Sequence, residues 1–219
     1  MEISRYLDYA VLKPEMTQQE LREAIQLGLE YDVATVCVQP RDIELAKELC
    51  KGTNTEVICV LDFPHGCATA AAKEALAGLY ADQGVTEIDM VMNYGYARSG
   101  EWDKVEDEVR RVVRQAHARN VGVKVIFETS QLTVEEIKKG VEVCIAAGAD
   151  FVKTSTGFYG EGATMTSVGA MIEAAQGRIK VKPSGGIRDR ATVEKFIEMG
   201  AERIGAGAAS VAALCGEKK

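Results

Sequence analysis

Two segments of the chain place a lysine at the end of a short apolar run and follow it with small or hydroxyl-bearing residues. Residues 150–157 read DFVKTSTG and carry Lys153, and residues 178–186 read RIKVKPSGG and carry Lys182. Burial disfavours a charged ammonium, so a lysine at the end of a buried strand loses its proton more readily and becomes a nucleophile. If both lysines share one site, each positive charge should also lower the pKa of the other.

Three more polar residues, Asp89, Lys124 and Lys180, lie within apolar strand candidates. The alternation that aims Lys182 inward would aim Lys180 inward as well, and an interior with lysines and an aspartate would form a proton-relay network. His65 lies in a loop that could line the site, and His117 lies in a polar helix and is expected at the surface. Two isolated histidines give no metal-ligand spacing, so no metal site is expected.

Strand and helix patterns alternate along the chain. The strand candidates are residues 7–12, 34–38, 57–61, 87–92, 122–127, the two lysine-bearing segments and 203–206. Capping boxes at Thr17 and Thr133 open helices that reach Leu29 and Ala147. Further helices are predicted over residues 43–49, 68–79, 105–118, 167–175 and 191–199, and from residue 208.

The sequence therefore predicts an α/β fold, a (β/α)₈ TIM barrel formed by one domain over residues 1–219, with an open doubly wound sheet as the alternative. The strands are apolar throughout, as parallel strands covered by helices should be. In such a barrel the active site lies where the strands end, which is the place of Lys153 and Lys182. Gly185, Gly186 and Gly205 follow the seventh and eighth strands, where this fold often binds phosphate; tight turns are the simpler alternative.

Composition limits the class of protein. The chain has 219 residues, of which 47% are hydrophobic and 27% charged, with a net charge of −7. This balance predicts a globular protein and argues against binding to nucleic acid or an anionic membrane. Six cysteines without a C-x-x-C pair indicate reduced thiols. No signal peptide and no apolar run long enough to span a bilayer, about 18 residues, is expected.

Five blocks, in order, resemble the deoxyribose-phosphate aldolase family over nearly the whole chain. They are residues 36–40 (VCVQP), 87–91 (EIDMV), 124–129 (KVIFET), 151–158 (FVKTSTGF) and 181–188 (VKPSGGIR). The family consists of class I aldolases that use neither metal nor cofactor on a (β/α)₈ barrel. They cleave 2-deoxy-D-ribose 5-phosphate reversibly to acetaldehyde and D-glyceraldehyde 3-phosphate.

The resemblance implies a role for each matching residue. Lys153 would form the Schiff base, Lys182 would lower the pKa of Lys153 and assist proton transfer, and Asp89 would be the acid/base partner. Lys124, Cys37 and Thr154 would have supporting roles. It also implies a cytoplasmic protein that is a homodimer and binds only small aldehydes and a sugar phosphate.

The chain departs from the family at the phosphate end. Gly207 and Ala208 occupy the positions where the family has two serines, and Ala10 replaces a threonine. The residues expected to bind substrate or phosphate are Gly157, Gly185, Gly186, Gly205, Gly207 and Ala208. We therefore expect aldolase activity with weaker dependence on the phosphate. Two alternatives remain: an aldolase for another, non-phosphorylated aldehyde pair, and a catalytically silent sensor of sugar phosphates.

Overall fold

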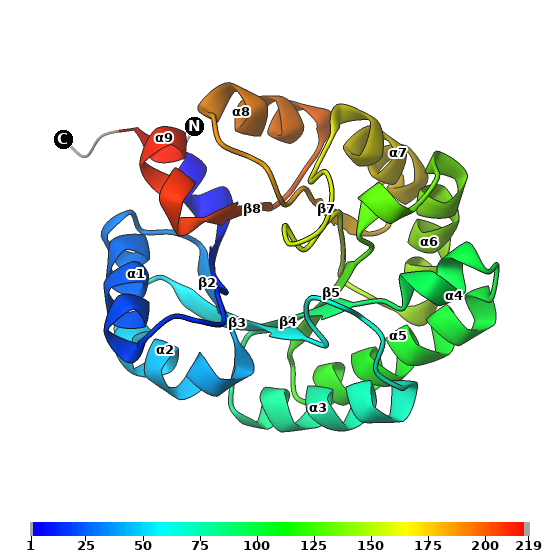
Figure 1. Cartoon of the computed structure of the whole chain (residues 1–219), viewed down its shortest axis with the longest axis horizontal. Coiled ribbons are helices and arrows are strands. Elements are labelled where there is room, and N and C mark those ends of the chain that lie inside the picture. Colours follow the sequence, from blue (N-terminus) through cyan, green and yellow to red (C-terminus); the bar gives the residue numbers. More distant parts are fainter. Residues whose placement is uncertain (1, 217–219) are drawn as a thin grey trace.

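The computed structural model describes residues 2–216, in which eight parallel strands form the wall of a barrel (Figure 1). The strands are β1 (Leu7–Val11), β2 (Thr35–Val38), β3 (Glu56–Leu61), β4 (Glu87–Val91), β5 (Gly122–Ile126), β6 (Phe151–Lys153), β7 (Lys180–Lys182) and β8 (Ile204–Gly207). Their order in the sheet is β7-β6-β5-β4-β3-β2-β1-β8. The two ends of this sheet meet through a bridge between Ser184 and Gly205, where Gly205 N–H donates to the carbonyl of Pro183 at 2.8 Å. The predicted (β/α)₈ barrel is thus confirmed against the open sheet.

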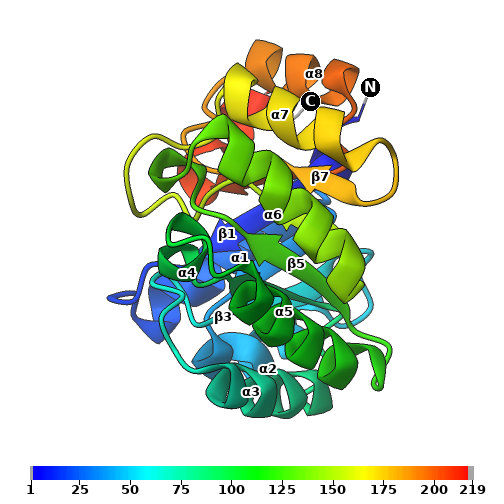
Figure 2. The same ribbon diagram turned by 90° about the vertical axis from the view of Figure 1, so that its right-hand side faces the viewer.

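Helices cover the outside of the barrel. The α-helices are α1 (Gln18–Glu30), α2 (Ile43–Cys50), α3 (Ala70–Asp82), α4 (Tyr94–Arg98), α5 (Trp102–His117), α6 (Val134–Ala147), α7 (Met165–Ala175), α8 (Arg190–Met199) and α9 (Val211–Cys215). Four short 3₁₀ turns are η1 (Ile3–Tyr6), η2 (Pro40–Asp42), η3 (Thr129–Gln131) and η4 (Ala208–Ser210). Figure 2 shows α5, α6 and α7 following one another around one side. None of the helices within residues 2–216 is long and apolar enough to cross a membrane.

Local sequence signals explain where several helices begin and end. Both predicted capping boxes form, with Thr17 and Thr133 each accepting from and donating to its partner glutamate. Gly148 and Gly200 end α6 and α8 in the left-handed conformation, which glycine adopts without steric cost. The short helix α4 was not predicted, because five residues with two tyrosines and a glycine carry no helical periodicity.

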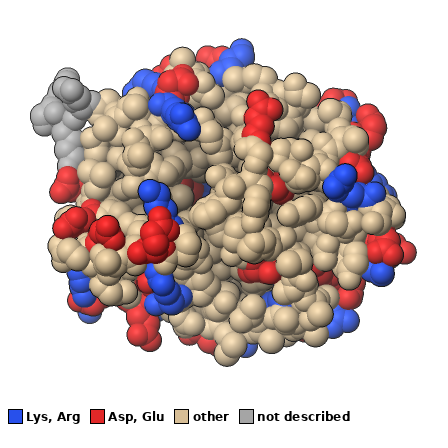
Figure 3. Space-filling view, in the orientation of Figure 1, with Lys and Arg blue, Asp and Glu red and all other residues tan. Residues whose placement is uncertain are grey.

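The strands separate an apolar layer outside the barrel from an interior that holds most of the buried charges. Most buried apolar side chains form one large core, which includes Tyr9 of β1 and Ile88 of β4, whose parity is opposite to that of Asp8 and Asp89. A separate small cluster of Leu12, Cys37, Ile58 and Val60 lies on β2, β3 and the residue after β1. Charged residues of β1 and β4–β7 meet in the interior and are described below. On the face seen in Figure 3, acidic and basic side chains are interspersed and lie mainly towards the edge, so this face carries no continuous basic surface.

Candidate active site

The register of the sheet brings the predicted site residues together. Lys153 and Lys182 are direct neighbours across β6 and β7, and Asp89 and Lys124 are direct neighbours across β4 and β5. All four side chains are buried, with at most 3% of any residue exposed. Direct neighbours in a parallel ladder point to the same side of the sheet, so the four side chains converge in the interior.

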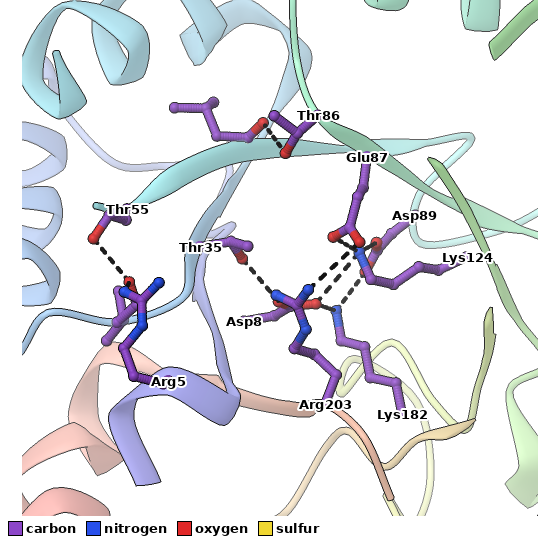
Figure 4. A network of polar contacts seen from close by, with 12 residues as sticks. Arg5, Asp8, Thr35, Thr55, Thr86, Glu87, Asp89, Lys124, Lys182 and Arg203 are labelled. Atoms are coloured by element: carbon purple, nitrogen blue, oxygen red, sulfur yellow. Dashed lines mark hydrogen bonds and ion pairs between the residues drawn. The ribbon is translucent and has the colours of Figure 1, made fainter. Parts of the chain in front are cut away.

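Asp89 is the centre of this convergence. Its Oδ2 lies 2.8 Å from Lys153 Nζ and 2.7 Å from Lys182 Nζ. Its Oδ1 lies 3.2 Å from Lys124 Nζ. One carboxylate therefore contacts three amino groups, and Figure 4 shows it between Lys124 and Lys182.

Asp8, Glu87 and Arg203 complete the network and were missed at the level of sequence. Asp8 Oδ2 contacts Lys182 Nζ, and Asp8 Oδ1 accepts a hydrogen bond from Arg203 at 3.0 Å (Figure 4). Glu87 contacts Lys124 Nζ and lies 3.6 Å from the Arg203 guanidinium. The sequence did carry a signal for two of them. Glu87 precedes Asp89 by two residues and so points to the same side of its strand, and Asp8 is an acid inside an apolar strand.

The balance of charges in the buried network distinguishes Lys153 from the other cations. Among the described residues, the network joins three carboxylates to four cationic side chains: Asp8, Glu87 and Asp89 with Lys124, Lys153, Lys182 and Arg203. One cation is therefore in excess. Lys182 contacts two carboxylates, whereas Lys153 contacts Asp89 alone. Because an uncompensated buried charge is costly, the excess proton is lost most easily from Lys153.

The pKa shifts agree with this count. Burial lowers the pKa of Lys153, and the charge of Lys182 lowers it further, although Asp89 opposes both. Burial also disfavours charge on Lys182, but Asp8 and Asp89 outweigh burial and raise its pKa above the usual value. The predicted lowering of one lysine's pKa by the other is therefore seen at Lys153, whereas at Lys182 the two carboxylates decide the direction of the shift.

Two of the expected supporting residues lie beside the lysines. Cys37 is 1% exposed, and burial raises the pKa of its thiol to about 12, so it stays protonated at neutral pH. Thr154 faces β7: its hydroxyl donates to the carbonyl of Ser184 at 3.0 Å and accepts from the Ser184 N–H at 2.9 Å. Thr154 thus fixes the start of the loop that follows Lys182.

A cavity of about 710 Å³ opens at the ends of β1, β7 and β8, and it is lined by Ser184 and Gly205 but not by Lys153 or Lys182 themselves. Its lining includes all six residues predicted to bind substrate or phosphate: Gly157, Gly185, Gly186, Gly205, Gly207 and Ala208. Ala10 also lines it, together with Lys13 and Arg188, two cations that the sequence analysis did not select. The cavity therefore combines glycine backbone with two cations and one acid, Glu15.

Gly205 links this cavity to the lysines. A Cβ atom there would lie 2.3 Å from Ser184 Oγ and 3.3 Å from Lys182 Cε, so only glycine fits without moving Ser184. Gly207 is different, since nothing lies within 4 Å of a Cβ built on it and its φ of −82° suits any residue. A serine would fit at position 207.

Glu128 is a further buried acid that the sequence analysis did not select. It follows β5 with a φ of 55°, and its Oε2 accepts a hydrogen bond from Thr156, which lines the cavity. Its Oε1 has no hydrogen-bond partner among the described residues. Burial raises the pKa of this carboxyl, and the nearby charge of Lys153 opposes the increase only in part.

Some predicted positions lie elsewhere. Lys180 has the inward parity that was expected but is exposed at the opposite end of the barrel, 5.1 Å from the centre of the Phe151 ring, so it does not join the interior network. His117 is exposed, as predicted, and contacts Asp150 at 2.8 Å. His65 is exposed beside Tyr159, with 5.8 Å between ring centres. In the described part of the chain, no group of three His, Cys, Asp or Glu residues could hold a metal ion.

Comparison with known proteins agrees with this geometry. A family described as DeoC/LacD family aldolase matches residues 3–216. The chain belongs to this family. The deoxyribose-phosphate aldolase of Aquifex aeolicus is 41% identical over 205 residues, which cover 94% of this chain and 92% of that protein. The protein of the same name from Bacillus cytotoxicus is 40% identical over 219 residues, or 100% and 97% of the two chains.

Solved structures extend the likeness to the fold of the DeoC/LacD family. A putative deoxyribose-phosphate aldolase from Coccidioides immitis superposes with a TM-score of 0.92 at 36% identity, covering 97% of this chain and 84% of that chain. An aldolase called QR15 gives a TM-score of 0.90 at 39% identity, covering 97% and 94%. The resemblance stated from the five sequence blocks is therefore confirmed.

Proposed function

We propose that this chain cleaves 2-deoxy-D-ribose 5-phosphate to acetaldehyde and D-glyceraldehyde 3-phosphate through an imine on Lys153. Membership of the aldolase family and relatives of that name at about 40% identity support the reaction. The observation that carries the role of Lys153 is its place as the one cation in excess of the buried carboxylates. An amine has to be uncharged to attack a carbonyl, and Lys153 is the amine that this network leaves least compensated.

The proposed reaction begins with attack of Lys153 Nζ on the aldehyde carbon of the sugar. Loss of water gives a protonated imine, which withdraws electrons from the neighbouring carbon. The C2–C3 bond then breaks as the C3 hydroxyl loses its proton, which releases the aldehyde that carries the phosphate and leaves an enamine. Protonation of the enamine carbon and hydrolysis of the imine release acetaldehyde and restore Lys153.

The other residues of the network would supply the charges and the proton transfers that these steps need. Lys182 stays charged between Asp8 and Asp89, which places a positive charge beside the amine and a proton donor in the interior. Asp89 contacts both lysines and is proposed as the acid/base partner between them. For attack at neutral pH the pKa of Lys153 has to fall by roughly 3 units from about 10.4, or about 4 kcal/mol, which burial and a neighbouring ammonium can supply.

Trapping the imine tests this proposal. Borohydride reduction in the presence of acetaldehyde should leave an ethyl group on Lys153, located by mass mapping of peptides, and Lys153→Ala should abolish both the label and turnover. Labelling should survive EDTA. A protein that stays unlabelled while an established class I aldolase is labelled would favour the alternative of a silent sensor.

We also propose that the phosphate binds in the 710 Å³ cavity with reduced selectivity. Gly157, Gly185 and Gly186 line the cavity with their backbone, whereas the Gly205 N–H already donates to the carbonyl of Pro183. Lys13 and Arg188 add positive charge and Glu15 one negative charge, but the two serine hydroxyls of the family are missing at Gly207 and Ala208. Hydrogen bonds to a charged group contribute roughly 1.5–3 kcal/mol each, so two of them can change phosphate binding a hundredfold.

Restoring the hydroxyls tests the phosphate proposal. The variant Gly207→Ser/Ala208→Ser should increase the ratio of kcat/KM for glyceraldehyde 3-phosphate over glyceraldehyde by tenfold or more. An unchanged ratio would refute reduced selectivity.

Three further expectations stay predictions. They are a single domain over residues 1–219, a homodimer and a cytoplasmic location. A relative from Aeropyrum pernix, 28% identical, is described as a tetramer, so the assembly of this chain has to be measured.

A further inference from the structure

The charged network continues beneath the two lysines to the end of the barrel where the strands begin. Arg203 precedes β8 and Glu87 opens β4, and their side chains are 19% and 14% exposed. Figure 4 shows Arg203 and Glu87 on either side of Asp8 and Lys124. Neither residue lines the cavity at the ends of β1, β7 and β8. In barrels of this kind that end usually contributes stability and not chemistry.

Asp8 connects Arg203 to the lysines. Its Oδ1 accepts hydrogen bonds from Arg203 at 3.0 Å and from Thr35 at 2.9 Å. The other oxygen is left to face Lys182 and Lys124. Lys182 reaches Asp89, which also contacts Lys153. Every side chain between Arg203 and Lys153 is therefore in direct contact with the next.

A second connection of opposite charge begins at Glu87. Its carboxylate contacts Lys124 Nζ, which lies 3.2 Å from Asp89 Oδ1. Arg203 and Glu87 are thus a cation and an anion at the same depth of the barrel, each joined to Asp89 through one or two buried side chains.

We propose that Arg203 and Glu87 are positioning residues of the reaction, which set the charge balance at the Lys153 amine through Asp8 and Lys124. This inference rests on the proposed role of Lys153 as the nucleophile. It gives two residues at the end of the barrel where the strands begin an effect on the reaction at the end where the strands finish.

Other charged and titratable groups face Arg203 and Lys153, and all of them except Glu87 stay unchanged in the test. Around Arg203 they are Asp8 from β1, Glu56 from β3, Glu87 from β4, and Lys124 and Lys180 beside the shared Phe151 ring. Around Lys153 they are Asp89 from β4, Lys182 from β7, Cys37 from β2 and Glu128 after β5.

The two residues should move the pKa of Lys153 in opposite directions. Removing the positive charge of Arg203 favours the charged form of Lys153 and raises its pKa, whereas removing the negative charge of Glu87 lowers it. At an effective dielectric constant of about 20, charges that act through one or two intervening side chains should shift this pKa by about 0.5–1 unit in each direction. Substitutions that acted only through packing would not be expected to shift the pKa of Lys153 in opposite directions.

The test measures how imine trapping at Lys153 depends on pH. Arg203→Met, Glu87→Gln and the unaltered chain are treated with acetaldehyde and borohydride at a series of pH values, and the label on the Lys153 peptide is quantified. The pH of half-maximal labelling should rise for Arg203→Met and fall for Glu87→Gln. Arg203→Lys should return it towards that of the unaltered chain.

Arg178→Met is the matched control. Arg178 lies just before β7 at the same end of the barrel and pairs with Glu142 at 2.9 Å, outside the interior network. It should leave the pH of half-maximal labelling unchanged. If Arg203→Met does not fold, Glu87→Gln tests the inference by itself. Its pH of half-maximal labelling should then be lower than that of the unaltered chain.

The experiment distinguishes failure of this inference from failure of the proposed function. Labelling curves that coincide for all variants, or that move in the same direction for Arg203→Met and Glu87→Gln, would overturn this inference. Absence of any label on Lys153 in the unaltered chain would instead overturn the proposed function, and the variants would not need to be compared.

Discussion

Lys153 and Lys182 are chemically identical, adjacent and equally buried, yet their environments favour opposite protonation states. The difference comes from Asp8, which contacts Lys182 and not Lys153 in the described network. Two carboxylates compensate one ammonium fully, whereas Lys153 shares a single carboxylate oxygen with its neighbour. Their roles are thus assigned by the acids around them and not by the lysines themselves.

At the residue scale, this difference predicts the effect of Lys182→Leu. Loss of the neighbouring ammonium leaves Lys153 alone with Asp89 Oδ2, so the pKa of Lys153 should rise by at least one unit. At neutral pH kcat/KM should fall at least tenfold, and the acidic limb of its pH profile should move to higher pH. Lys195→Leu, which removes an exposed lysine from α8, is the control. An unmoved limb would remove Lys182 from its proposed role.

At the scale of elements, the contact between the loops after β7 and β8 depends on one glycine. Gly205→Ala would bring a methyl group within 2.3 Å of Ser184 Oγ and close to Lys182 Cε. We expect this variant to lose activity at least tenfold through displacement of Lys182, while Gly207→Ala, which meets open space, keeps it. Steady-state kinetics of the two variants compare them directly. Equal activity would show that the close approach at Gly205 is not needed.

A second ion cluster joins α3, α5 and the ends of two strands. Lys73 is fully buried, and its Nζ donates to Glu108 at 2.8 Å and to the carbonyls of Val91 and Gly66 at 2.9 and 3.0 Å. Lys73→Met leaves Glu108 buried without its cation and should lower the free energy of unfolding by about 3 kcal/mol or more. In Lys73→Met/Glu108→Leu the loss should be smaller, because the buried charge of Glu108 is removed as well; Asp62, 3.5 Å from Lys73 Nζ, loses this cation in both variants. Urea unfolding measures both, and a double variant no more stable than the single one would contradict this explanation.

The sequence predicted most of the elements and four of the seven residues of the network. Asp89, Lys124, Lys153 and Lys182 could be found because each interrupts an apolar strand at a position with inward parity. Arg203 could not be found, because its partner Asp8 lies 195 positions away and only closure of the barrel brings β1 beside β8. Lys180 was wrongly expected in the interior network, because parity gives the direction of a side chain but not its depth. Lys180 begins its strand, where the barrel opens to solvent.

At the scale of the whole molecule, the buried acids predict how stability depends on pH. Burial disfavours ionised Asp8, but Lys124, Lys182 and Arg203 outweigh it and hold the pKa of Asp8 well below its usual value. A lowered pKa in the folded state contributes stability above the unfolded value of about 3.9, and this contribution is lost as pH falls towards the folded value. Below about pH 4 each such group should cost about 1.4 kcal/mol per pH unit.

Asp8→Asn should therefore flatten the acid side of the stability curve. Urea unfolding between about pH 5 and pH 2.5 should show a slope smaller by about 1.4 kcal/mol per unit than that of the unaltered chain. Glu198→Gln, an exposed change on α8, should keep the original slope. Parallel slopes for Asp8→Asn and the unaltered chain would mean that Asp8 is not held ionised by its three cations.

The most direct measurement for the whole account is the pKa of Lys153 itself. Lysine labelled with ¹³C at Cε can be followed by NMR across a pH titration, and the signal of Lys153 is identified by its loss in Lys153→Arg. We predict that Lys153 titrates below the usual lysine value of about 10.4, because it is buried beside the charge of Lys182, and that Lys182 titrates above it. A Lys153 signal that titrates at or above the usual value would contradict the claim that this barrel holds an uncharged nucleophilic amine.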